Sequence, residues 1–181
     1  LNTLSRDKWN GNIQELADRL QGDQVLETAN RLRDSGQERE AETLLRQQPQ
    51  STRIDLTLAD WAQQRGDRTA AKAAYRTVLQ REPQNTDAIL GLTEVYLSEG
   101  DKDAARTQLA MLPARQNNEP PSVNMQRRVA LAQAELGDTA AAEQTFSKLV
   151  PQAKSQPPSM DSALVLRDAA RFQASNGQPQ Q

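Results

Sequence analysis

The sequence predicts an all-α chain in which antiparallel helix pairs stack into a right-handed solenoid. Three observations support this fold class. Apolar residues recur at helical spacing along most of the chain. Glycines followed by a polar residue recur at intervals of 30 to 40 residues, as expected for a repeated turn. β-branched residues never alternate with polar ones over a length that would form a strand.

The stretch 52–83 shows the repeating unit most clearly. Each half carries an apolar stripe at helical spacing, and Gly66 stands between them because it tolerates the left-handed conformation of a helix end. The Asp67 carboxylate is placed to cap the second helix. Small Ala71 allows the two helix backbones to approach closely, and Pro83 ends the second helix.

The same unit recurs along the chain. The turn glycines are Gly36, Gly66, Gly100, Gly137 and Gly177. Five residues after the first four of these glycines stands an alanine, namely Ala41, Ala71, Ala105 or Ala142. Nine residues after the same glycines stands a large apolar residue, namely Leu45, Tyr75, Leu109 or Phe146. Because one helix pair cannot bury its apolar face alone, these units are expected to stack.

This pattern resembles the tetratricopeptide repeat, a helix–turn–helix unit of 34 residues. The best single match is 86–119, with Tyr96 and Gly100 in signature places, although the signature tryptophan is weak in most copies. We expect one solenoid over 1–181, with residues 1–22 as the tail or a helix of a preceding repeat. The expected repeats are 23–51, 52–85, 86–119, 123–156 and a truncated 160–181.

The individual helices follow from their apolar stripes and from the residues that interrupt them. Pro83 and Pro151 are expected to close second helices. Two proline-bearing insertions, 114–123 and 151–160, account for the longest spacings between turn glycines. The expected helices outside 52–83 are 12–20, 23–35, 37–47, 87–99, 102–112, 123–136, 139–150 and 160–176.

The composition excludes several classes of function. The chain has 22 basic and 24 acidic residues, so it lacks the positive charge typical of nucleic-acid binding. It contains no histidine and no cysteine, which removes imidazole bases, thiolate nucleophiles, disulfides and the usual zinc ligands. No apolar run is long enough for a transmembrane helix. We therefore expect no enzymatic activity, no cofactor and no metal.

Most acidic and aromatic residues have structural interpretations. The acidic pairs Glu38 with Glu40 and Asp101 with Asp103 fall at helix starts, where the helix dipole favours negative charge. Five aromatic residues fall at packing positions of the repeat, namely Trp61, Tyr75, Tyr96, Phe146 and Phe172, which leaves Trp9 unassigned. A row of exposed aromatic rings that could grip sugars is therefore not expected.

The first helices of stacked pairs line the concave side of such a solenoid. The groove contacts expected from this register are Arg53, Thr57, Asp60, Gln64, Asp87, Glu94, Ser98, Asn124, Arg127 and Arg128. Their mixed charge suits an extended peptide, another protein or a hydrated polymer. Arg127 and Arg128 have two interpretations, a basic patch for an anion or an ordinary charged surface beside Glu135.

The chain as a whole resembles the cellulose synthase operon protein C family from residue 13 to residue 177. The passages that carry the resemblance are STRIDLTLADWAQQRGD, DAILGLTEVYLSEGD, QRRVALAQAELGDTAAAEQTF and LVPQAKSQPPSMDSALVLRDAARF. The resemblance implies a longer protein with a signal peptide, a periplasmic repeat array and an outer-membrane β-barrel that exports cellulose. It implies that this chain is a fragment of the periplasmic array, and it supplies no catalytic residues.

Three functions follow from these observations. The first is a non-enzymatic periplasmic scaffold that links an inner-membrane cellulose synthase to an outer-membrane export barrel. Its partners would be other subunits of the synthase complex and the barrel of the same chain. The second is direct guidance of cellulose along the groove, with peptidoglycan as a further possible glycan. The third is a general module that binds peptides or proteins.

Overall fold

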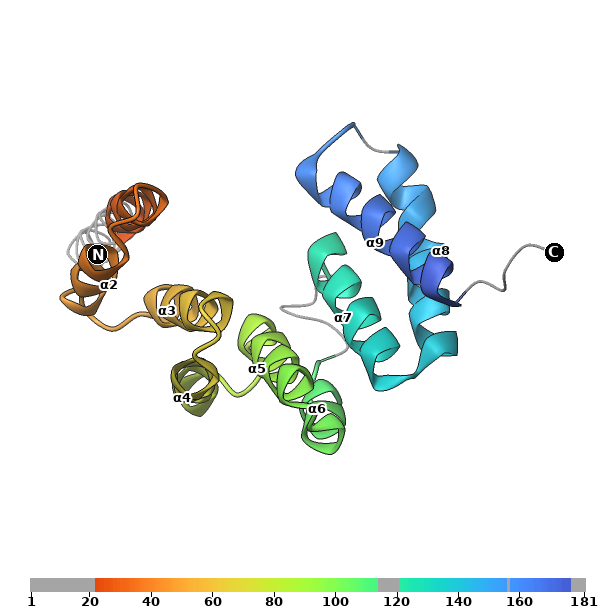
Figure 1. Ribbon diagram of the computed structural model, residues 1–181, viewed down its shortest axis with the longest axis horizontal. Coiled ribbons are helices and arrows are strands. Elements are labelled where there is room, and N and C mark those ends of the chain that lie inside the picture. The colour runs from red at the N-terminus through yellow and green to blue at the C-terminus, as the bar shows by residue number, and fades with distance from the viewer. Residues whose placement is uncertain (1–21, 114–120, 156, 177–181) are drawn as a thin grey trace, which may run out of the picture. The chain divides into compact units, whose positions relative to one another are not determined.

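Helices make up nearly all of the computed structural model, which describes residues 22–113, 121–155 and 157–176. One helix covers 22–34. The labelled helices are α2 (Glu38–Arg46), α3 (Thr52–Gln64), α4 (Arg68–Arg81), α5 (Thr86–Glu99), α6 (Lys102–Leu109), α7 (Val123–Leu136), α8 (Thr139–Ser155) and α9 (Met160–Asn176). No strand occurs within these ranges, so the predicted all-α class is confirmed (Figure 1). None of these helices has the length and hydropathy needed to cross a bilayer.

The chain divides into two compact units, Leu1–Leu58 and Ala59–Gln181. In the described part of the first unit, apolar side chains of three helices are buried, namely Leu26, Ala29, Ala41, Leu45 and Ile54. Arg53 of α3 forms an ion pair with Asp23 in this unit. The expected helix 12–20 and Trp9 lie outside the described residues.

The second unit contains residues 59–64 of α3 and all helices from α4 to α9. Helices α5 and α6 form one antiparallel pair, and α7 and α8 form the next (Figure 1). The first helices of successive pairs also contact one another, α5 with α7 and α7 with α9. This arrangement brings side chains of α5, α7 and α9 together although they lie far apart in the sequence.

The turns between paired helices are formed as predicted. Gly36, Gly66, Gly100 and Gly137 all have φ between 78° and 89°, a left-handed conformation that favours glycine. The Asp67 carboxylate accepts a hydrogen bond of 3.0 Å from the Ala70 N–H, which confirms its role as a cap. Gly177 lies outside the described residues.

The alanine that recurs five residues after each turn glycine is fully buried in all four copies. In the second unit, Ala105 belongs to an apolar cluster with Leu97 and Leu136, and Ala142 belongs to another with Phe146 and Phe172. The Phe146 and Phe172 rings pack at an angle of 37°, with centroids 5.4 Å apart. These clusters join each second helix to the first helix of its own pair and of the following pair.

Two sequence predictions about helix ends were wrong. Helix α6 ends at Leu109, three residues before the predicted end at residue 112. Pro151 does not close its helix, because α8 continues to Ser155. Leu149 and Ala153, on either side of this proline, are buried against Val165 of α9, and this packing offsets the hydrogen bond that proline cannot donate.

Tyr75 controls how closely α4 and α5 approach. Its side chain is fully buried, and its ring lies directly against the backbone of α5 at Gly91. A Cβ atom at Gly91 would lie 2.3 Å from Tyr75 Cζ, which is closer than real atoms approach. The lack of a side chain at Gly91 therefore makes room for this ring.

We expect Gly91→Ala to lower the free energy of unfolding by about 2 kcal/mol, because α4 and α5 must separate to relieve the collision. Urea denaturation followed by circular dichroism would measure the loss. Gly22→Ala is the control, since a Cβ there meets nothing within 4 Å. It should be neutral or stabilising by up to about 1 kcal/mol. Equal stability of the Gly91→Ala variant and the parent would contradict this packing.

Candidate functional site

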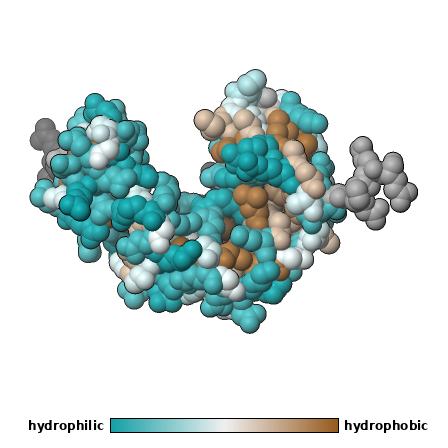
Figure 2. Space-filling view, in the orientation of Figure 1, coloured by the Kyte–Doolittle hydropathy of each residue, from teal (hydrophilic) through white to brown (hydrophobic). Residues whose placement is uncertain are grey.

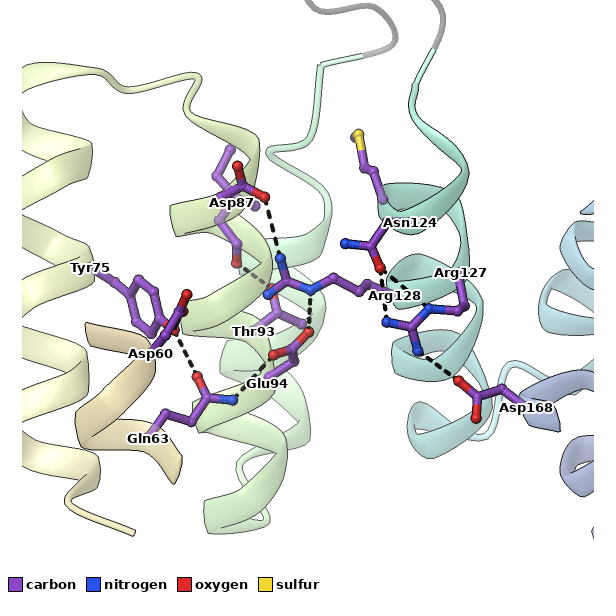
Figure 3. Close-up of polar contacts among 12 residues, drawn as sticks. Asp60, Gln63, Tyr75, Asp87, Thr93, Glu94, Asn124, Arg127, Arg128 and Asp168 are labelled. Carbon is purple, nitrogen blue, oxygen red and sulfur yellow. Dashed lines mark hydrogen bonds and ion pairs between the residues drawn. The ribbon is translucent and has the colours of Figure 1, made fainter. Parts of the chain in front are cut away.

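The side chains of the first helices form a connected set of polar contacts in the second unit. We call this surface the first-helix face and define it by the residues Asp60, Gln63, Asp87, Glu94, Arg127, Arg128 and Asp168. They come from α3, α5, α7 and α9, and Figure 3 shows their contacts. The buried clusters described above bring α5, α7 and α9 together, so this part of the polar set is a consequence of the apolar packing.

One end of the face is organised by the hydroxyl of Tyr75. It lies 2.5 Å from Asp60 Oδ1 and 2.8 Å from Gln63 Oε1, so its single hydrogen is shared between two acceptors (Figure 3). The Tyr75 ring is buried, and its hydroxyl therefore needs a hydrogen-bond partner. Asp60 and Gln63, one helical turn apart on α3, provide this partner.

Gln63 connects this end to Arg128 on α7. Its side-chain amide donates to Glu94 Oε2 at 3.1 Å, and Arg128 Nε donates to Glu94 Oε1 at 2.7 Å. Arg128 Nη1 also lies 3.4 Å from Asp87 Oδ1. The Arg128 side chain is 17% exposed, so its guanidinium is largely enclosed by these carboxylates. A continuous chain of contacts thus joins α3, α5 and α7.

The ionisation of these groups follows from their surroundings. Loss of water raises the pKa of Asp60 above its ordinary value, and the hydrogen bond from Tyr75 only partly opposes this. Burial, together with the Asp60 carboxylate, raises the pKa of the Tyr75 hydroxyl. Burial alone would lower the pKa of Arg128, but Glu94 and then Asp87 raise it, so this side chain stays charged.

A second cluster joins α7 to α9. Arg127 Nη1 donates to Asp168 Oδ2 at 2.6 Å, and Arg167 donates to Oδ1 of the same carboxylate at 2.8 Å. The Asp168 side chain is only 5% exposed. Its burial would raise the pKa of this carboxyl, but the bonds from Arg167 and Arg127 outweigh burial and lower it below 3.8.

An open groove of about 660 Å³ lies between α7 and α9 beside this second cluster. Its lining includes Arg127, Leu131, Glu135, Arg167, Asp168 and Arg171. Figure 2 shows brown apolar patches among teal polar surface where these helices lie. Leu131 and Leu166 are each 36% exposed, and both belong to the few large apolar residues that are exposed in the described ranges.

The structure brings some of the predicted groove residues together and separates others. Asp60, Asp87, Glu94 and Arg128 form one cluster, as described above. Asn124 accepts from Arg127 at 2.9 Å. Ser98 lies elsewhere on α5 and accepts from Arg68 of α4 at 3.0 Å. Arg53 and Thr57 belong to the first unit, and Gln64 is exposed at the end of α3.

Sequence reasoning missed the partner of Arg127. The sequence placed Arg127 either in a basic patch or on a charged surface near Glu135, but its ion pair is with Asp168, which is 41 residues away. Gln63 was also missed, although it stands three residues after Asp60 and so shares its helix face. Neither arginine forms a free basic patch, because Asp87, Glu94 and Asp168 already neutralise them.

Further polar contacts join each second helix to the next first helix near the turns. Lys72 of α4 pairs with Glu99 of α5 at 2.8 Å, and Arg76 donates to the Tyr96 hydroxyl at 2.8 Å. One repeat later, Arg106 of α6 donates to the Leu136 carbonyl oxygen at 2.9 Å. Lys72 and Arg106 both stand six residues after a turn glycine, so this polar contact between a second helix and the next first helix recurs with the repeat.

The described residues offer little for catalysis. Within these ranges, no three acidic side chains lie close enough together to hold a metal ion. Glu38, Glu40 and Asp103 lie in first helical turns, and Asp101 caps α6 by accepting from the Ala104 N–H at 3.0 Å. The predicted interpretation of these carboxylates as helix-start residues is therefore confirmed.

Comparison with known proteins identifies the class of protein. Residues 62–129 match the model of the tetratricopeptide repeat family. A thermophilic TPR protein of Thermus thermophilus superposes with a TM-score of 0.67 at 20% identity, covering 86% of this chain and 82% of that one. Kinesin light chain TPR-like repeats from Podosopora anserina superpose with a TM-score of 0.64 at 19% identity, covering 89% and 88%. This chain therefore has the tetratricopeptide-repeat fold.

The resemblance predicted from the sequence is also confirmed. The chain is 71% identical over its full length to cellulose synthase operon protein C of Escherichia coli (strain K12). It is 68% identical, over 99% of its length, to the protein of the same name in Salmonella typhimurium (strain LT2). The chain spans 15% of the length of each of these relatives.

We expect Asp168→Asn to lower the free energy of unfolding by about 3 kcal/mol at neutral pH, because it leaves the largely buried Arg127 without its counter-charge. The folded-state pKa of Asp168 is below 3.8, so its contribution is present above that value and is lost as pH falls through the folded-state pKa. The difference between parent and variant should therefore shrink at an acidic pH below the folded-state pKa of Asp168.

Chemical denaturation of the parent and of Asp168→Asn at neutral pH and at this acidic pH would test the prediction. Glu135→Gln is a matched control in the same groove, and as an exposed substitution it should change stability by less than about 0.5 kcal/mol. A constant deficit of Asp168→Asn at both pH values would contradict a role for the charge.

Proposed function

We propose that this chain is a non-enzymatic scaffold within a bacterial cellulose synthesis and export system. It lies in the periplasm and links the synthase to an outer-membrane barrel through protein contacts. Support for the cellulose system comes from the name of the relatives that match the whole chain at 68 to 71% identity. Support for a scaffold comes from the repeat fold, whose stacked helices offer extended binding surfaces.

The observation that carries the proposal is the first-helix face itself. Its arginines are already held by carboxylates on neighbouring helices, so the face needs little reordering when a partner binds. Asp87 is 67% exposed and remains accessible while it contacts Arg128. A rigid surface with exposed polar edges suits the contact of one folded or extended protein segment with another.

Guidance of a glucan chain is the alternative. The open groove favours it, since hydrated sugars can hydrogen-bond to arginine, carboxylate and amide side chains. The aromatic residues oppose it, because Trp61, Tyr75, Phe146 and Phe172 are all at least 92% buried. Sugar rings therefore find little aromatic surface on which to stack in the described part of the chain.

Photocrosslinking in cells that make cellulose would separate these functions. A benzoylphenylalanine in place of Asp87 should form adducts with a protein subunit of the cellulose system, identified by mass spectrometry. The same substitution at Thr77, which is exposed on the second helix α4, is the matched control and should give a much lower yield. Adducts at Asp87 that cellulase removes and that contain no protein would contradict the proposal. Equal adduct yields at Asp87 and Thr77 would also contradict it.

A further inference from the structure

The first-helix face has opposite charge character at its two ends. The carboxylates of Glu94 and Asp87 contact the Arg128 guanidinium, and the Asp60 carboxylate interacts with it electrostatically without a direct contact. Along the α7–α9 groove, three arginines accompany two carboxylates, Glu135 and Asp168. The acidic end lies on α3 and α5, and the arginine-rich end lies on α7 and α9.

The groups at each end differ in how far they are already engaged. Arg127 and Arg167 share the buried carboxylate of Asp168, while Arg171 has no ion pair among the described residues. Arg167 keeps half of its side chain exposed, at 52%. At the other end, Asp87 retains 67% exposure although it contacts Arg128. Each end therefore keeps charge that an incoming group can reach.

Apolar side chains lie next to the arginines. Leu131 lines the groove with Arg171, and Leu166 directly precedes Arg167 in the sequence. Both leucines are 36% exposed. Such a combination of arginine and partly exposed apolar side chains is typical of surfaces that bind protein. Glu135, which also lines the groove, disfavours a purely anionic partner.

We propose that the first-helix face binds an extended polypeptide segment with a basic residue at one end and an acidic residue beside an apolar residue at the other. The basic residue pairs with the exposed carboxylate of Asp87, next to Glu94. The acidic residue pairs with Arg171 and Arg167, and its apolar neighbour contacts Leu131. This inference rests on the proposed scaffold function and names the chemistry of its partner.

The geometry sets the spacing between the two charges. Packed helices lie about 10 Å apart, so the step from α5 across α7 to α9 spans about 20 Å. An extended chain advances about 3.3 Å per residue, so about six residues separate the basic group from the acidic one. A segment in which these charges are adjacent cannot reach both ends at once.

Fluorescence anisotropy with synthetic peptides tests this on the 181-residue chain. The first peptide carries a lysine pair, a neutral spacer of six residues and then an aspartate–leucine–aspartate end. The second has the same composition with its charges adjacent. We expect the spaced peptide to bind at least tenfold more tightly than the second peptide, and we expect its affinity to fall as salt is raised.

Variants locate the interaction. Arg171→Glu should weaken binding of the spaced peptide at least tenfold, whereas Arg39→Glu, an exposed control on α2 of the first unit, should not change it. Unchanged helicity would show that both variants fold. Equal affinities for the two peptides, or no effect of Arg171→Glu, would overturn the inference. So would binding of cellohexaose that depends on Arg171 when neither peptide binds.

The two proposals can fail separately. Protein adducts at Asp87 combined with equal affinities for the two peptides would support the scaffold function and reject this partner chemistry. The opposite combination is binding of the spaced peptide through Arg171 together with only glucan adducts in cells. It would support the proposed partner chemistry and reject the scaffold function.

Discussion

Much of the second unit depends on how it accommodates the buried phenol of Tyr75. The ring occupies the space between α4 and α5 that only a glycine at position 91 leaves open. A buried hydroxyl must be hydrogen-bonded, because an unmade bond costs about 1–3 kcal/mol. Asp60 and Gln63 meet this requirement, and Gln63 in turn fixes Glu94. The apolar packing and the polar face are thus linked through one side chain.

The ion pairs on the first-helix face distinguish charged groups that hold neighbouring helices together from charged groups that remain exposed. Glu94 holds Arg128, and Asp168 holds Arg127, so two of the arginines on this face mainly join neighbouring repeats. Breaking such partly buried pairs is expensive even where their formation contributes little net stability. The exposed groups at the edges, of which Asp87 and Arg171 are the clearest examples, are the ones that the proposed partner can reach.

Local rules explain why so much of the fold could be predicted from the sequence. Gly66 and Gly100 need a left-handed turn, Asp67 and Asp101 cap helices, and the recurring alanines mark close approach. These signals act over a few residues. The contact of Arg127 with Asp168 depends on how repeats stack, and so does the contact of Gly91 with Tyr75. Sequence spacing alone could not reveal these contacts.

The helix through Pro151 shows the limit of local rules most clearly. Proline usually ends a helix, yet burial of Leu149 and Ala153 against Val165 keeps α8 continuous. The insertion that was expected to begin at residue 151 therefore begins later. Tertiary packing, which the sequence pattern does not show, outweighed the local preference.

The most direct test of this account is a ¹H–¹⁵N spectrum of the arginine side chains in the 181-residue chain. Arg128 Nε donates to Glu94 at 2.7 Å in a largely enclosed site, so its Nε–H should exchange slowly with water and shift in a Glu94→Gln variant. The Nε–H of Arg171 should exchange rapidly. Equal and rapid exchange of both groups would show that the face is not held by its own ion pairs, which would contradict the account.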